Sequence, residues 1–143
     1  MIGAIAGDIV GSVYEHRNIT VTDFPLFDPH CTFTDDTVLT VAVADAILSG
    51  ADYRDKLKEY FRAYSDRGYG GGFRKWAASS NDPPGQSMGN GSAMRVSPVG
   101  FAFDALEEVF VAHRRVCPRS TARYACVRHD SELRAPGTFS SPP

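Results

Sequence analysis

Phe33-Thr34-Asp35-Asp36-Thr37 stands directly before an apolar run, Val38 to Leu48, that is rich in Val, Ala, Ile and Leu. A hydroxyl residue before such a run is typical of a helix N-cap, so we expect a buried helix at about 34–48 that begins after Thr34. Asp35 and Asp36 would then lie in the first turn, where the free N–H groups and the helix dipole favour negative charge.

The two neighbouring carboxylates of this stretch allow two interpretations. Side chains at successive helix positions point about 100° apart, so Asp35 and Asp36 diverge and could each bind one of two closely spaced hard cations. Thr34 would add a neutral oxygen to such a site. The plainer interpretation is a helix cap, a common structural feature worth roughly 0.5–2 kcal/mol. The stretch alone favours the cap, and the rest of the chain has to decide.

Composition narrows the class of protein. The chain has 143 residues, of which 43% are hydrophobic and 22% charged, as in one soluble globular domain. No apolar run approaches the roughly 20 residues that span a bilayer, and no basic region of a signal peptide opens the chain, so we expect no membrane as a partner. Three cysteines without metal-ligand spacing fit a reducing compartment, and we expect a cytoplasmic protein.

Charge is distributed unevenly along the chain. Residues 1–110 carry nine Lys or Arg against 15 Asp or Glu, whereas residues 111–143 carry six Arg against two acidic residues. A basic tail can indicate nucleic-acid binding, but these arginines are scattered and few aromatic residues lie between them, so we expect no nucleic acid as a partner. The abrupt change predicts a domain at 1–110 and an atypical basic tail at 111–143, which a shifted reading frame or an added, disordered segment would explain.

Residues 2–14 are predicted to form a helix of small residues. Gly3, Gly7 and Gly11 recur at every fourth position and therefore share one face. Each glycine costs a helix about 1 kcal/mol relative to alanine, so we expect another backbone to approach that face closely. A dinucleotide-binding turn is rejected, because it requires G-x-G-x-x-G after a strand.

The loop that follows this helix is a candidate functional segment. Residues 16–32 contain two prolines and exceed the usual length of structural loops, and loops of that length are often functional. We expect the loop to fold Glu15 back beside Asp35 and Asp36. The alternative is that Glu15 is simply solvated, as a lone Glu at a helix end usually is.

Two more helices are expected, at about 53–64 and 104–115. Their apolar stripes are Leu57, Tyr60, Phe61 and Tyr64 in the first and Leu106, Val109 and Phe110 in the second. Between them, the glycines from Tyr69 to Phe73 predict a permissive loop before a short turn that carries Trp76. Residues 1–110 show no strand-like alternation, so the predicted fold class is all-α.

A glycine-rich segment precedes the last of these helices. It reads Gly85-Gln86-Ser87-Met88-Gly89-Asn90-Gly91, and a helix beginning near Ser92 would point its positive end at an anion. Glycines also let backbone N–H groups approach a ligand closely, so the pattern is typical of a phosphate or diphosphate cradle. It lacks the lysine of a P-loop. A plain glycine turn capped by Ser92 is the alternative.

Four motifs of this chain, in their order and spacing, resemble those of the ADP-ribosylglycohydrolase family. They run from Gly3 to Glu15, from Phe33 to Thr37, from Tyr69 to Phe73 and from Ser87 to Arg95. The resemblance covers about residues 1–110. It implies an all-α, orthogonal helical bundle, of which this chain has the N-terminal part.

The resemblance also implies a function and a set of site residues. The family removes ADP-ribose from modified side chains and carries two Mg²⁺ ions, for which Mn²⁺ can substitute. The implied metal ligands are Thr34, Asp35, Asp36 and Glu15, and the implied catalytic residues are Asp36 and Glu15. The implied binding residues for the adenylate and diphosphate of an ADP-ribosylated protein or small molecule are Gly72, Ser87, Met88, Gly89, Asn90 and Gly91.

The chain departs from the family pattern in its C-terminal part. The family completes its metal pair with an Asp-x-Asp-[Thr/Ser] motif, and Asp130-Ser131-Glu132-Leu133 has the wrong third acid with no hydroxyl after it. A His-Asn-His-Pro segment expected after the helix at 104–115 is also missing. We therefore expect an impaired hydrolase. The alternatives are a non-catalytic module that binds ADP-ribose or a nucleotide, and a fragment that folds only with a partner.

Overall fold

Helices provide all the regular secondary structure in residues 1–80, 83 and 89–116, which are the residues that the computed structural model describes. The elements are α1 (Ile2–Gly11), the 3-10 helix η1 (Ser12–Tyr14), α2 (Asp35–Ser49), α3 (Tyr53–Ala63), α4 (Gly71–Ala78), α5 (Gly91–Met94), α6 (Ser97–Ala102) and α7 (Leu106–Val116). The all-α prediction is confirmed. Within the described ranges, no helix has the length and apolar character needed to cross a membrane.

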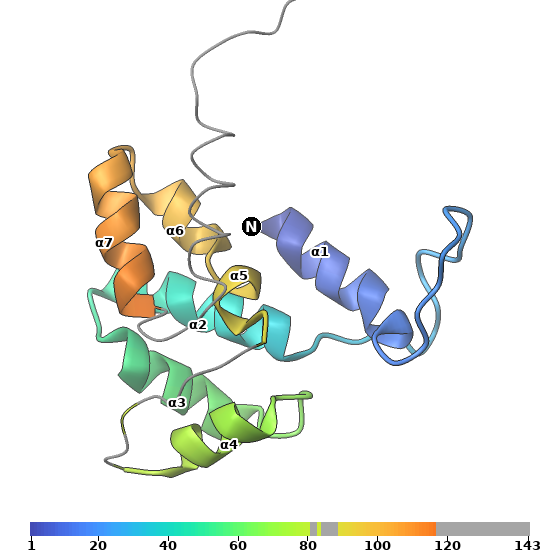
Figure 1. The fold of residues 1–143 in the computed structure, drawn as a ribbon, viewed down its shortest axis with the longest axis horizontal. Coiled ribbons are helices and arrows are strands. Elements are labelled where there is room, and N and C mark those ends of the chain that lie inside the picture. The colour runs from blue at the N-terminus through green and yellow to red at the C-terminus, as the bar shows by residue number, and fades with distance from the viewer. Residues whose placement is uncertain (81–82, 84–88, 117–143) are drawn as a thin grey trace, which may run out of the picture.

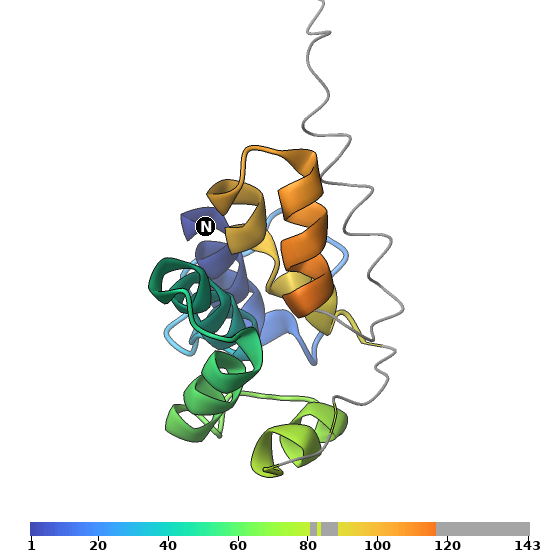
Figure 2. The same ribbon diagram turned by 90° about the vertical axis from the view of Figure 1, so that its left-hand side faces the viewer.

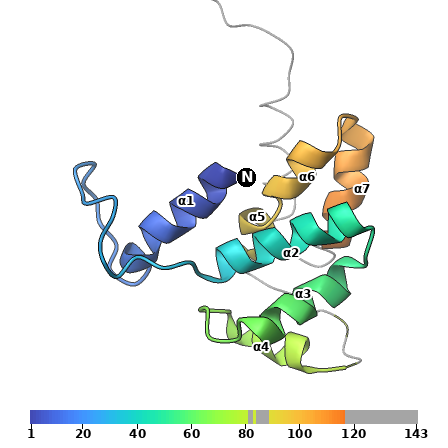
Figure 3. The ribbon, with the colours of Figure 1, turned by 180° about the vertical axis from the view of Figure 1, so that it is seen from behind.

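Helix α2 is the central element of the fold. It contacts α1, α3, α5 and α6, with α6 and α7 on one side of it and α3 and α4 on the other (Figures 1 and 3). Its buried residues are Val38, Leu39, Thr40, Ala42, Val43, Ala44 and Ala46. Gly50 ends the helix with a φ of 67°, a left-handed conformation that costs glycine little. The predicted helix and its termination are confirmed.

An aromatic cluster fills the space between α3 and α4. The Tyr69 and Phe73 rings stack with their centroids 5.4 Å apart, and Phe61 of α3 contacts both rings edge-on. The predicted permissive loop and short turn around Trp76 are wrong, because this segment forms the eight-residue helix α4. Phe73, Trp76 and Ala77 recur at helical spacing, and burial of Trp76 and Ala77 outweighs the cost of glycines in the first turn.

On the other side of α2, α6 and α7 form the far end of the molecule from α4 (Figure 2). The helix expected to begin near Ser92 consists of two short helices, α5, which ends at Met94, and α6, which buries Pro98 and Val99. Helix α7 confirms the predicted last helix and buries Val109, Ala112, His113 and Val116. Leu106 is 41% exposed, so the predicted apolar stripe is wrong at this position, because the helix only begins there.

The predicted boundary between residues 110 and 111 falls inside α7, which continues to Val116. Residues 117–143, which include Asp130 and Glu132, lie outside the described residues. The division into a domain and a basic tail therefore stays a prediction.

Helix α1 contacts α2 but buries none of its own residues in the described part of the chain. A Cβ atom added at Gly3, Gly7 or Gly11 would meet no described atom within 4 Å. Among the described residues, the predicted close approach of another backbone to this glycine face is therefore wrong. Gly7 and Gly11 instead line an open cleft between α1 and the start of α2.

Candidate functional site

A cleft of about 480 Å³ lies at the N-terminus of α2. Its lining residues are Gly7, Asp8, Gly11, Ser12, Glu15, Thr34, Asp35, Asp36, Gly68, Gly70, Asn90 and Met94. They come from α1, η1, the first turn of α2, the segment before α4 and the segment around α5. The fold thus brings the four predicted metal ligands, together with Asn90, to one cleft.

Asp8 of α1 binds the N-terminus of α2 through both carboxylate oxygens. Its Oδ1 accepts a 2.5 Å hydrogen bond from the Thr34 hydroxyl. Its Oδ2 accepts from the Thr34 amide at 2.8 Å, from the Thr37 amide at 3.1 Å and from the Thr37 hydroxyl at 2.5 Å. The carboxylate therefore satisfies an amide of the first helical turn that has no partner within the helix. The sequence patterns assign Asp8 no role, although it is the one polar residue of α1.

Thr34 is the N-cap of α2, as predicted. Its Oγ1 accepts a 3.3 Å hydrogen bond from the Asp36 amide, while its hydroxyl proton goes to Asp8. A hydroxyl has one proton and two lone pairs, so one lone pair of Oγ1 has no partner among the described residues. The capping interpretation is confirmed, and it leaves this oxygen able to bind a ligand in the cleft.

Burial and neighbouring carboxylates raise the pKa of Asp35 and Asp36. Burial raises the pKa of Asp36 to about 6, and the charges of Asp35, Asp8 and Glu15 act in the same direction. Burial also raises the pKa of Asp35, with smaller contributions from Glu15 and Asp8 that Arg95 opposes. Half-buried carboxylates that repel one another gain from a bound cation, and such shifts are common at functional sites.

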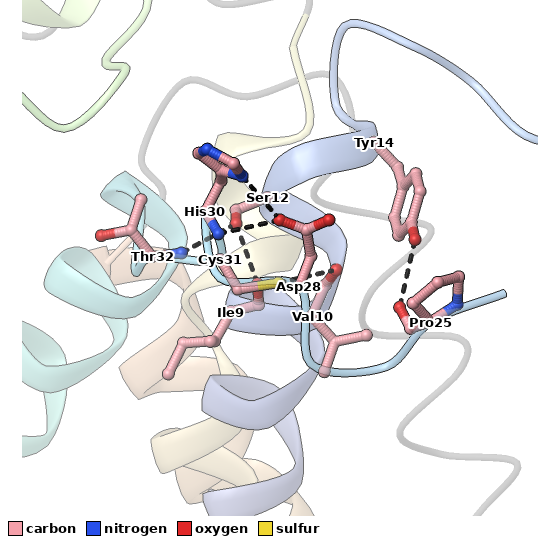
Figure 4. Close-up of polar contacts among 9 residues, drawn as sticks. All are labelled: Ile9, Val10, Ser12, Tyr14, Pro25, Asp28, His30, Cys31 and Thr32. Carbon is pink, nitrogen blue, oxygen red and sulfur yellow. Dashed lines mark hydrogen bonds and ion pairs between the residues drawn. The ribbon is translucent and has the colours of Figure 1, made fainter.

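Hydrogen bonds join the loop at 16–32 to the C-terminal end of α1 and to η1 (Figure 4). The Tyr14 hydroxyl donates to the Pro25 carbonyl at 3.1 Å, and the Thr32 amide donates to the Ser12 hydroxyl at 3.1 Å. These contacts hold the middle and the C-terminal end of the loop beside η1, directly before Glu15. The exposed Glu15 lines the cleft, and its charge reaches Asp35 and Asp36, as the loop prediction expects.

A family model described as ADP-ribosylglycohydrolase matches residues 1–132. The chain belongs to the ADP-ribosylglycohydrolase family. It is 29% identical to the ADP-ribosylhydrolase ARH3 of Bos taurus over 146 residues and 28% identical to that of Mus musculus over 145 residues. Each match covers 76% of this chain but only 40% or 39% of the relative, so the chain spans about two fifths of their length.

The donor set of the cleft suits the hard cations implied for the ADP-ribosylglycohydrolase family. All the candidate donors are oxygen atoms, which Mg²⁺ and Mn²⁺ prefer. Among the described residues, no three His, Cys, Asp or Glu side chains lie close enough together to bind one metal ion. In the described part of the site, a single ion would therefore be bound by two carboxylates at most. Thr34 and water would supply its other ligands. Mg²⁺ is commonly bound by one or two carboxylates and several waters, so the residues fit it.

Not every predicted binding residue of this family member lies at the cleft. Gly72 is exposed in the first turn of α4, whereas Gly68 and Gly70 line the cleft in its place. Ser87 and Met88 lie outside the described residues. Gly89 and Gly91 flank Asn90, which is the member of this trio that lines the cleft.

Buried contacts hold this segment in position behind the cleft. The buried Thr40 of α2 donates its hydroxyl to the Met94 carbonyl at 3.0 Å, which fixes α5 against α2. The position of Asn90 follows from that contact, because α5 begins directly after it.

Proposed function

We propose that this ADP-ribosylglycohydrolase family member removes ADP-ribose from modified protein side chains by hydrolysis that depends on Mg²⁺ or Mn²⁺. The observation that carries the proposal is the meeting of Thr34, Asp35, Asp36 and Glu15 at one cleft. The two relatives are named as ADP-ribosylhydrolases, which supports the same substrate class. The N- or O-glycosidic bond of the modified side chain is the bond to be cleaved.

Thr34, Asp35 and Asp36 are the proposed ligands of the cation, with Glu15 at the rim. A divalent cation held by these residues would supply Lewis-acid chemistry, orienting the substrate's hydroxyl groups and favouring ionisation of water. Asp35 and Asp36 diverge from one helical turn, so they can contact neighbouring positions of a substrate or two neighbouring ions. Burial, and after it the neighbouring negative charges, raise the pKa of both carboxyl groups, and a bound cation would favour their ionised forms.

Glu15 and Asp36 are the two candidates for the general base. A general base has to come within hydrogen-bond reach of the attacking water. Glu15 is exposed and follows η1 at the start of the loop, so it can approach a water on the open side of the cleft. Asp36 is half-buried beside Asp35, a position better suited to a cation ligand.

The walls of the cleft suit the diphosphate and ribose of ADP-ribose. Its volume of about 480 Å³ lies within the roughly 300–1,000 Å³ of small-molecule sites. Gly7, Gly11, Gly68 and Gly70 leave backbone exposed on two sides, which lets a ligand approach closely. Asn90 adds a side-chain amide that can donate to a phosphate oxygen. Gly72 and the segment from Ser87 to Gly91 remain proposed contacts of the adenylate and diphosphate.

ADP-ribose release tests this proposal. The chain is incubated with ADP-ribosylated serine and arginine peptides, with Mg²⁺ or with a chelator, beside an Asp36→Asn variant. We expect release above background with Mg²⁺ only, and its loss in the variant. Release that neither chelator nor substitution reduces would contradict the proposed site.

A second function is a module that binds ADP-ribose without hydrolysis. It is favoured by the lack, in the described part of the chain, of a third acidic ligand for one ion. ADP-ribose would then raise the melting temperature of the chain without any release from modified peptides. We propose a reducing, cytoplasmic location for either function, since Cys31, the cysteine within the described ranges, is a free thiol.

A further inference from the structure

We infer that Asp8 is a positioning residue for the cation site. It draws the proton of the Thr34 hydroxyl away from the cleft, so that an oxygen lone pair of Thr34 is left for the cation. The inference rests on the proposed function, because it requires that a divalent cation binds at Thr34, Asp35 and Asp36.

The direction of the Thr34 proton follows from the chemistry of its partners. An ionised carboxylate only accepts hydrogen bonds, so the 2.5 Å contact between Thr34 Oγ1 and Asp8 Oδ1 must use the Thr34 proton. The Asp36 amide only donates, so its 3.3 Å contact occupies one of the two lone pairs of Thr34. One lone pair remains on an oxygen whose residue lines the cleft.

The other oxygen of Asp8 fixes the orientation of this carboxylate. Oδ2 accepts from the amides of Thr34 and Thr37 and from the Thr37 hydroxyl. These three donors converge on one oxygen and so fix the plane of the carboxylate. Oδ1 is therefore held toward the Thr34 hydroxyl.

A helix cap alone does not require the charge of Asp8. Asn satisfies helix amides about as well as Asp does, whereas a third negative charge beside Asp35 and Asp36 adds repulsion. With Asp8→Asn, the amide oxygen has to occupy the Oδ2 position, so the amide nitrogen would face Thr34 Oγ1. Thr34 would then accept two hydrogen bonds, and its own proton would point toward the cleft. A hydroxyl in that orientation cannot coordinate a cation.

Mn²⁺ titration of the full chain, by calorimetry and by electron paramagnetic resonance of the free ion, tests the inference. We expect Asp8→Asn to weaken Mn²⁺ binding by roughly 10- to 100-fold, as loss of groups that orient metal ligands does. We expect Thr34→Val to weaken it by a similar factor. In the Thr34→Val background, Asp8→Asn should change the affinity by less than about twofold, because the hydroxyl through which it acts is gone.

A matched control is Thr37→Val. Thr37 donates its hydroxyl to the same carboxylate but does not line the cleft, so the substitution should lower stability and leave Mn²⁺ affinity within about twofold of wild type. If Asp8→Asn does not fold, Asp8→Glu replaces it. The longer side chain displaces the acceptor, and its effect on Mn²⁺ affinity should likewise vanish in the Thr34→Val background.

Wild-type affinity in Asp8→Asn would overturn the inference. An equal loss in both backgrounds would also overturn it, because that result indicates a through-space effect of the Asp8 charge. Both outcomes leave the proposed function intact, since the wild type still binds the cation. If the wild type takes up no Mn²⁺, the proposed cation site fails and the role of Asp8 fails with it.

Discussion

The backbone amide of Asp35 donates a 2.7 Å hydrogen bond to the carbonyl oxygen of Arg67. The next residue, Gly68, has a φ of 91°, and a Cβ atom added there would lie 3.5 Å from Asp35 Oδ1. The segment before α4 thus lies directly against the first acid of the pair at the start of α2. Only glycine adopts that backbone conformation without strain.

We predict that Gly68→Ala destabilises the protein by roughly 1–2 kcal/mol, because the left-handed φ strains an alanine. It should also weaken cation binding, since the strained loop contacts Asp35. Urea denaturation measures the first effect and Mn²⁺ titration the second. The matched control is Gly72→Ala, at an exposed helical position where a Cβ meets no described atom, and it should be neutral or slightly stabilising.

The glycines of α1 allow a test that separates stability from binding. Gly3→Ala, Gly7→Ala and Gly11→Ala should each stabilise α1 by up to about 1 kcal/mol, because the added methyl group meets no described atom within 4 Å. Gly7 and Gly11 line the cleft and Gly3 does not. Calorimetry should therefore show weaker ADP-ribose binding for the second and third variants only. Equal affinity of all three variants for ADP-ribose would show that α1 does not contact the ligand.

The raised pKa of Asp36 predicts how the stability of the cation-free protein depends on pH. The folded state binds the Asp36 proton more tightly, because burial raises the pKa of this group from its ordinary value of 3.8 to about 6. The stability from this proton is fully present below the lower pKa and is lost as the pH rises through the higher one. With a chelator present, the protein should therefore be more stable near pH 5 than near pH 7.5, as far as Asp36 contributes.

Asp36→Asn should flatten this pH dependence and stabilise the cation-free protein near pH 7.5 by about 1 kcal/mol, a value reduced for the partial exposure of the group. Urea denaturation across this pH range measures both effects. If Asp36→Asn is less stable than the wild type at neutral pH, the Asp36 charge stabilises helix α2 through its dipole. That result would contradict a role of this carboxylate mainly in ligand binding.

The start and end of helix α2 could be predicted from the sequence. Thr34 and Gly50 bracket an apolar run, and both cap the helix as hydroxyl residues and glycines do. Helix α4 could not be predicted from the sequence, because its glycines disfavour a helix. The burial of Trp76 against other elements decides its conformation. The glycines of α1 led to a wrong prediction of close helix packing for a related reason. Small residues can leave space for a packed helix or for an open cleft, and their spacing does not distinguish the two.

The residues of the candidate site likewise differ in whether the sequence alone predicts them. Thr34, Asp35 and Asp36 are neighbours in the sequence, so their pattern indicates a site before any fold is known. Asp8 lies 26 residues before Thr34, and only the contact between α1 and α2 brings them together. Its sequence signal was a single acidic residue within an otherwise apolar helix, which indicates a partner but not which one.

The most direct test of the cation site is a titration of the wild-type chain and Asp36→Asn with Mn²⁺ and Mg²⁺, followed by calorimetry and thermal melting. The control is Asp55→Asn, which removes an exposed carboxylate in the first turn of α3, away from the cleft. We predict binding heat and a higher melting temperature for the wild type and the control, and at least about tenfold weaker binding for Asp36→Asn. Absence of any response in the wild type, or an unchanged affinity in Asp36→Asn, would contradict a cation site at the start of α2.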